Sequence, residues 1–161
     1  MQNMKKTSFL TKSAVIAALY VILTLISAAL GLSNGVIQLR LSEMLTVLPM
    51  FTNAAVPGIF IGCVVSNIAT GSAVWDVIFG SLATLIGGIG TYLLRKKSVF
   101  IAQLSPVISN VLIIPLVLKF VYGADGAFLF FVLTVGAGEM ICCEILGAVL
   151  WKNLKKHKIE L

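Results

Sequence analysis

Charged residues are scarce in this sequence. Asp, Glu, Lys and Arg make up 11% of its 161 residues, whereas a soluble domain of similar length carries about a quarter. Hydrophobic residues make up 59%, and the mean hydropathy is +1.07. No stretch outside the apolar segments is long enough to form a soluble domain. The composition therefore excludes a soluble globular protein and predicts a chain embedded in a lipid bilayer.

The residues and motifs on which most enzymes depend are equally few. The one histidine, His157, lies in a polar tail, and no Walker A, H-E-x-x-H or G-x-S-x-G motif occurs. An α-helix would rotate Glu144 about 140° from Glu139, so this pair cannot share one face. The sequence thus disfavours an intramembrane enzyme and contains nothing that could hydrolyse ATP. No C-x-x-C spacing occurs, and we expect three buried, apolar-type thiols: Cys63, Cys142 and Cys143.

Six apolar segments predict a compact all-α membrane bundle that forms one domain over residues 1–161. The continuous apolar runs favour helices over barrel strands. We expect helices at residues 13–31, 43–52, 56–70, 75–94, 99–122 and 127–151. The second and third are shorter than the about 20 residues of an upright span, so tilting, a kink at Pro49 or Pro57, or a flanking pocket is expected. A cleaved signal peptide is the alternative for the first segment, but its apolar run exceeds the about 7–15 residues typical of such peptides.

The cations predict the orientation in a bacterial cell membrane. With the N-terminus inside, Arg40 and Lys119 alone among the Lys and Arg residues lie outside, and an even number of spans returns both termini to the cytoplasm. Topology also explains the net charge of +6, so no nucleic-acid partner is expected. The cytoplasmic set is Lys5, Lys6, Lys12, Arg95, Lys96, Lys97, Lys152, Lys155, Lys156 and Lys158.

Three polar residues from three segments fall near mid-membrane. Asn67, Asn110 and Glu139 lie roughly 17–18 Å from the starts of their helices at 1.5 Å per residue. A charge at this depth costs at least about 2.5–3.5 kcal/mol, so Glu139 is expected to face protein, water or a ligand rather than lipid. The alternative for all three is structural, because polar side chains also join helices through hydrogen bonds.

Further polar and aromatic residues lie near the outer ends of their segments. Two plain alternatives exist: Arg40 and Glu43 form a surface pair of little energetic value, and Asp76 caps a helix beside an interfacial Trp75. We expect instead that they extend the polar column into a pocket open to the outside. The candidate binding residues are Tyr20, Gln38, Arg40, Glu43, Asn67, Trp75, Asp76, Asn110 and Glu139.

Small residues predict two close helix contacts. Ala14 and Ala18 form a small-xxx-small face on the first helix. The run GGIG at 87–90 permits close approach of a neighbouring helix and does not match G-x-G-x-x-G.

Five ordered blocks, IQLRLSEMLTVLP (37–49), PGIFIGCVVSN (57–67), WDVIFGSLAT (75–84), PVISNVLI (106–113) and VGAGEMI (135–141), resemble the QueT family over nearly the whole chain. Members of that family are substrate-binding S components of energy-coupling factor (ECF) transporters implicated in uptake of queuosine precursors. The resemblance implies six helices, cytoplasmic termini, and a loop at 31–42 that caps the ligand. It also implies partnership with a coupling membrane protein, contacted by Ala14 and Ala18, and with two ABC ATPases.

The ligand that the resemblance implies is 7-cyano- or 7-aminomethyl-7-deazaguanine. A carboxylate suits the N–H groups of a guanine-like edge, so we expect Glu139 to bind that edge and the two asparagines to read others. Trp75 or Tyr20 would stack on the rings, and Glu43 or Asp76 would meet an aminomethyl cation. A stand-alone proton-coupled carrier that titrates at Glu139 or Glu144 is the alternative function. A purely structural protein would not explain the polar column.

Overall fold

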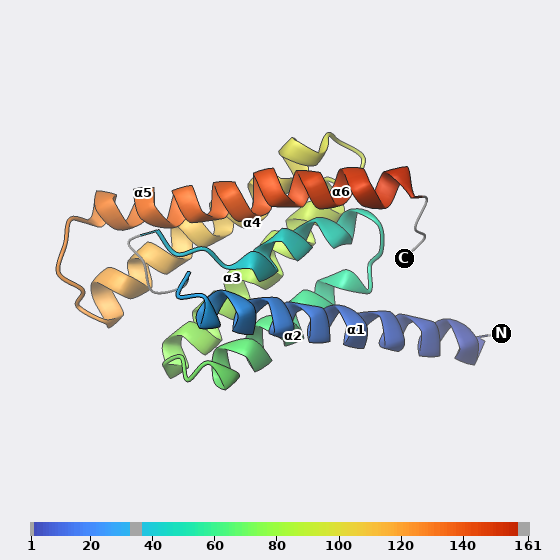
Figure 1. The fold of residues 1–161 in the computed structure, drawn as a ribbon, viewed down its shortest axis with the longest axis horizontal. Helices are drawn as coiled ribbons and strands as arrows, with labels where there is room; N and C mark the ends of the chain where they lie inside the picture. Colours follow the sequence, from blue (N-terminus) through green and yellow to red (C-terminus); the bar gives the residue numbers. More distant parts are fainter. Residues whose placement is uncertain (1, 33–36, 158–161) are drawn as a thin grey trace.

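The computed structural model describes residues 2–32 and 37–157, and this part of the chain is wholly helical (Figure 1). The predicted all-α bundle is confirmed. The helices are α1 (Gln2–Ala29), η1 (Leu41–Met50), α2 (Ala55–Ala69), α3 (Val74–Leu93), α4 (Val99–Leu116), η2 (Val117–Val121), α5 (Phe128–Glu139), η3 (Met140–Leu146) and α6 (Gly147–Lys156).

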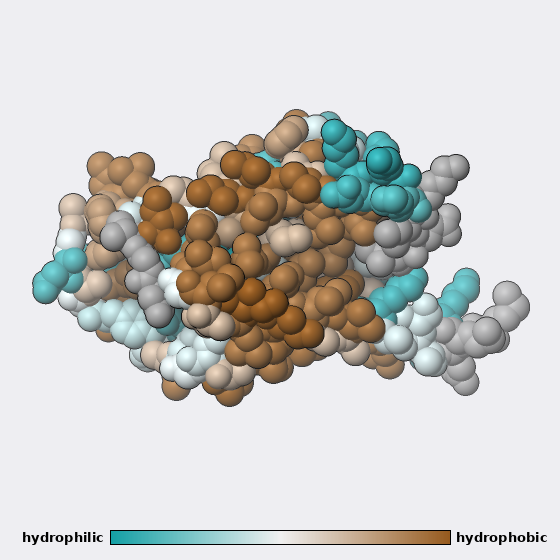
Figure 2. All heavy atoms as spheres, in the orientation of Figure 1, coloured by the Kyte–Doolittle hydropathy of each residue, from teal (hydrophilic) through white to brown (hydrophobic). Residues whose placement is uncertain are grey.

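These helices form six rods, because η2 continues α4 and η3 joins α5 to α6 without a break. Four stretches in the described chain are long and apolar enough to cross a bilayer: Lys5–Ala29, Val74–Leu93, Val99–Val121 and Phe128–Lys156. Figure 2 shows apolar side chains across the middle of the face in view. The chain is therefore a multi-pass membrane protein.

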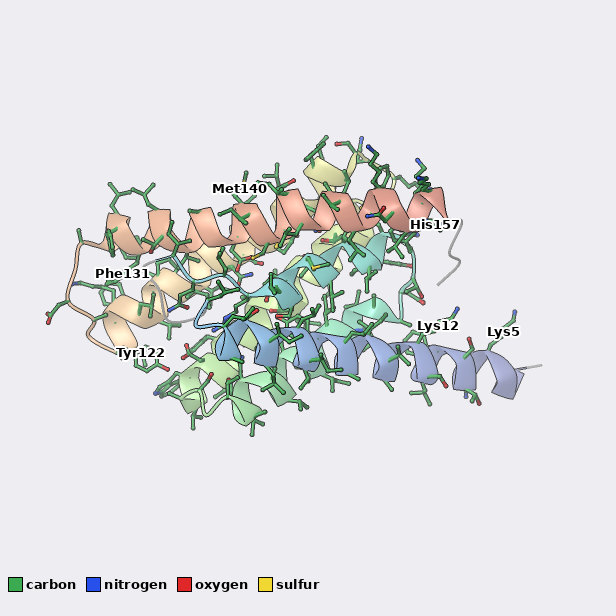
Figure 3. All side chains as sticks on the ribbon, viewed as in Figure 1. Lys5, Lys12, Tyr122, Phe131, Met140 and His157 are labelled. Carbon is green, nitrogen blue, oxygen red and sulfur yellow. The ribbon has the colours of Figure 1, made fainter. Side chains whose placement is uncertain are left out.

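The first helix is longer than predicted. It begins at Gln2 rather than at residue 13, because the segment before the apolar run contains no Gly or Pro to stop a helix. Figure 3 shows Lys5 and Lys12 of α1 at the same end of the bundle as His157, with Tyr122 at the opposite end. Cations of both terminal segments thus share one end, and which side of the membrane this end faces stays a prediction.

The two short rods, η1 and α2, have lengths close to those predicted. The η1 rod is a 3-10 helix of ten residues, and at about 2.0 Å rise per residue it extends farther than an α-helix of equal length. It crosses the interior beside α1, α3, η3 and α6 (Figure 1), and its central side chains from Leu45 to Pro49 are buried. This rod carries polar side chains into the core.

Glycines bring the helices into close contact. A Cβ on Gly62 would lie 2.6 Å from Tyr20 Cβ and 3.0 Å from the Ala17 carbonyl oxygen, so α2 packs directly on α1. The GGIG run behaves as predicted, since a Cβ on Gly87 would lie 2.5 Å from Pro106 Cα of α4. Ala14 and Ala18 lie on another side of α1 and are exposed. The intramolecular contact therefore leaves the predicted partner face uncovered by the described chain.

Candidate ligand-binding site

A small cavity lies between the segment before η1 and the helices α4 and α5. Its volume is about 30 Å³, the share of one water molecule in the liquid. Four of the predicted binding residues line it together with two aliphatic ones: Gln38, Arg40, Asn110, Glu139, Ile114 and Val135. A drug-sized ligand needs several hundred Å³, so a larger solute requires the lining to move.

Glu43 lies in the core next to this cavity and is 2% exposed. It accepts a hydrogen bond from the Tyr20 hydroxyl, and Thr84 Oγ1 donates to the same carboxylate oxygen, Oε1, at 3.5 Å. The second oxygen, Oε2, is buried without a hydrogen-bond partner in the described chain. Since a buried carboxylate oxygen normally has a donor, Oε2 is available to a bound molecule.

Glu43 and Glu139 approach each other although they come from different rods. One ligand-type atom from each, together with Cys143 Sγ, lies within 4.8 Å of the others. Cys143 donates to Glu139 Oε2 at 3.2 Å. These groups are types that bind metal ions, but we assign no metal here, because the Arg40 guanidinium lines the adjoining cavity and Glu43 already accepts two hydrogen bonds. Two carboxylates and one guanidinium give the site a mixed, asymmetric charge.

A glycine positions the segment that supplies Gln38 and Arg40. The Gln38 carbonyl oxygen lies so close to Gly138 of α5 that a Cβ there would overlap it. At the other end of the segment, the Ser27 hydroxyl accepts a hydrogen bond from Leu41 N at 2.9 Å, and Leu39 N donates to the Leu32 carbonyl at 3.0 Å. These contacts therefore position the backbone that closes one side of the cavity. The predicted capping loop, 31–42, lies partly outside the described residues, at 33–36.

Three predicted binding residues lie away from the cavity. Asn67 Nδ2 donates to the Asp76 carbonyl oxygen at 3.2 Å and so joins α2 to the first turn of α3. Trp75 is 49% exposed and stacks on Phe79. Asp76 follows the α3 N-cap, Ala73, rather than capping the helix itself. Burial and the neighbouring Asp76 carboxylate raise the pKa of Tyr122. Asp76 therefore lies near Tyr122, at the end of the bundle opposite to Lys5 and His157.

The predictions for Tyr20 and Glu144 were a ligand-stacking role and a position about 140° around an α-helix from Glu139. Tyr20 is 1% exposed and is already bonded to Glu43, so it supports the site from the core. The 140° rotation predicted for Glu144 assumed an α-helix, whereas Met140–Leu146 is a π-helix with a wider turn. Glu144 nevertheless does not line the cavity, and both its oxygens are buried without a partner in the described chain.

Four residues at or beside the site were not predicted from the sequence: Thr84, Ile114, Val135 and Cys143. The spacing of four residues from Glu139 to Cys143, and from Asn110 to Ile114, was a usable signal, because such residues share a helix face. Thr84 gave none, since its position depends on how α3 crosses η1. All three cysteines are buried and free, as predicted.

The fold and the site define the class of this protein: it is a multi-pass helical membrane protein with a small polar cavity between its rods. The chain belongs to the QueT transporter family, whose model matches residues 10–156. A Lactococcus lactis subsp. cremoris (strain MG1363) protein named "Queuosine precursor transporter QueT" is 43% identical over 82 residues, which cover 50% of this chain and 47% of the relative. The match thus spans about half the length of that relative. No solved structure matches.

Proposed function

We propose that this chain is the substrate-binding membrane subunit of an ECF-type importer and that its cavity binds a 7-deazaguanine precursor of queuosine. Family membership and the name of the Lactococcus relative support a queuosine precursor as the solute. The observation that carries the proposal is the convergence of Glu139, Asn110 and Arg40 on one cavity, with Glu43 beside it. Carboxylate, amide and guanidinium groups suit the donor and acceptor edges of a guanine-like ring.

Charge balance favours the 7-aminomethyl form of this ligand. With both carboxylates ionised, Glu43, Glu139 and Arg40 together carry one net negative charge. An aminomethyl ammonium would cancel this charge, whereas the neutral cyano form would leave a bound proton to cancel it, because isolated charge is costly in a buried site. Glu43 Oε2, which lacks a donor among the described residues, is the acceptor that we assign to the ammonium.

Calorimetric titration of the purified protein with both 7-deazaguanines tests this assignment. The Glu139→Gln variant is expected to lose at least about tenfold in affinity, because a charge-assisted hydrogen bond becomes a neutral one. Glu144→Gln is the matched control, since Glu144 is buried on the same rod but does not line the cavity. Equal affinity of Glu139→Gln and the unaltered protein would remove Glu139 from the binding site.

The ATP-driven mechanism rests on the family resemblance and on the exposed Ala14 and Ala18 face. Ala14→Trp and Ala18→Trp are expected to abolish co-purification with a coupling membrane protein and to leave ligand binding intact. Ile86→Trp, at a site 53% exposed on α3, is the control. Uptake that survives loss of the ATPases and stops with a protonophore would favour the proton-coupled carrier instead.

A further inference from the structure

Two adjoining hollows at the cationic end of the bundle have the chemistry of a phospholipid. One is polar, has a volume of about 440 Å³, and is lined by Lys5, Ser8, Phe9, Lys12, Thr52, Asn53 and Ala54. The other is an apolar groove of about 280 Å³, lined by Thr11, Lys12, Val15, Ile16, Leu19, Leu45, Leu48, Leu150 and Leu154. Lys12 belongs to both, so the polar hollow leads into the groove.

The two hollows follow one stripe of α1. Residues 5, 8, 12, 15 and 19 recur at spacings of three and four, which places them on one helix face. Figure 3 shows Lys5 and Lys12 projecting from the same side of α1. From Lys12 to Leu19 the helix rises about 10.5 Å toward the membrane centre. The charged part therefore lies at the end of the bundle and the apolar part deeper, in the order of a lipid headgroup and its acyl chain.

The polar hollow is electropositive because Lys5 and Lys12 contribute two cations. It also contains Ala54, the N-cap residue of α2. Ser13 Oγ donates to the Ala54 carbonyl oxygen at 2.8 Å, a buried bond that holds this helix start against α1. A phosphate is the group that such a setting favours.

The structure assigns this site to one anionic glycerophospholipid, with its phosphate between Lys5, Lys12 and the start of α2 and an acyl chain in the groove. At 100° per residue, Ala14 and Ala18 lie about 160° and 120° around α1 from Lys12. A protein partner on the alanine face would therefore lie away from Lys12 and would meet the groove at its Thr11 and Val15 edge. The site is separate from the ligand cavity, so it stands whether or not the proposed function does.

Native mass spectrometry of the purified protein in mild detergent tests the assignment. The probe is an equimolar mixture of phosphatidylglycerol and phosphatidylcholine with identical acyl chains. We expect one retained phosphatidylglycerol per protein, in preference to phosphatidylcholine. Each lysine near an anionic lipid contributes about fivefold, so Lys5→Gln/Lys12→Gln is expected to lower this preference by roughly 25-fold. Leu19→Trp, which fills the groove, is expected to lower retention of both lipids.

Lys96→Gln/Lys97→Gln is the matched control, because it removes the same charge outside both hollows. Equal loss in the two double variants would reduce the effect to general surface attraction and overturn the site. Equal retention of both lipids by the unaltered protein would do the same, as would displacement of the lipid by inorganic phosphate. A doubled protein mass without lipid would mean that a second copy of the chain, rather than a lipid, occupies the groove, and would overturn the site. A single elution peak on size exclusion confirms that each variant is folded.

Discussion

The Tyr20 hydroxyl of α1 donates a hydrogen bond to the Glu43 carboxylate of η1, and the two side chains are 1% and 2% exposed. This bond joins the first membrane span to the short rod that carries a charge into the core. It leaves one carboxylate oxygen of Glu43 without a partner in the described chain. The fold therefore positions the Glu43 carboxylate beside the cavity and leaves one of its oxygens free to accept a hydrogen bond from a ligand.

Tyr20→Phe is expected to destabilise the protein by about 1–3 kcal/mol, because Glu43 Oε1 would keep only the long Thr84 contact. Reversible unfolding in mixed micelles measures this change. Tyr122→Phe is the control, since Tyr122 is 39% exposed and its acidic neighbour is Asp76 rather than Glu43. An unchanged free energy of unfolding for Tyr20→Phe would mean that the Glu43 bond adds nothing to stability.

Gly138→Ala is expected to weaken binding of the 7-deazaguanine by about tenfold or more. Its Cβ would overlap the Gln38 carbonyl oxygen and displace the segment that carries Arg40. Gly136→Ala adds the same methyl group on the same helix, but there the Cβ would lie 3.5 Å from Val111, an ordinary contact. Titration of both variants measures the difference, and equal affinities would show that this segment does not set the geometry of the site.

The two buried asparagines are expected to act on different quantities. Asn67→Ala should cost about 0.6–2 kcal/mol of stability, because it removes the bond between α2 and α3, and should leave ligand affinity nearly unchanged. Asn110→Ala should lower affinity, because Asn110 lines the cavity. Unfolding and titration are measured on both proteins. A large loss of affinity in Asn67→Ala would mean that Asn67 contributes to the binding site after all.

Gly62→Ala is expected to destabilise the packing of α1 on α2 by about 1–3 kcal/mol. The new Cβ would lie 2.6 Å from Tyr20 Cβ and 3.0 Å from the Ala17 carbonyl oxygen, so it would clash with α1 at both residues. Gly80→Ala is the control, because its Cβ would lie 3.5 Å from Asn67 Nδ2. Unfolding in mixed micelles compares the two, and similar stabilities would mean that α1 and α2 can separate at little cost.

Proton linkage should distinguish the two precursors. The net negative charge of Glu43, Glu139 and Arg40 is buried, so we expect a proton to neutralise it before any ligand binds. The neutral cyano form is then expected to bind without net proton exchange. The aminomethyl cation would replace that proton, so its binding is expected to release up to one proton and its affinity to rise by up to about tenfold per pH unit as pH rises. Calorimetry in two buffers with different ionisation enthalpies counts the protons, and equal proton exchange for both ligands would contradict this charge balance.

Most of the fold could be predicted from the sequence because the bilayer constrains it so strongly. Apolar runs located all six rods to within a few residues, apart from the start of α1 and the end of α6, where polar and charged residues continue the helix beyond the apolar run. The short lengths of η1 and α2 were also predicted. The 3-10 and π geometry of η1 and η3 was not, because the choice between helix types depends on tertiary packing more than on local composition.

By itself, the sequence determined that the chain lies in a membrane, where its helices run, and that polar residues such as Arg40, Asn67 and Glu139 are exceptional in such a chain. Only the tertiary structure decided which polar residues meet. Glu43 reaches Glu139 because η1 crosses the interior beside η3, whereas Asn67, at similar computed depth, joins α2 to α3 instead. Depth along a helix follows from counting residues, but the direction in which a side chain points is set by how each helix rotates to pack on its neighbours.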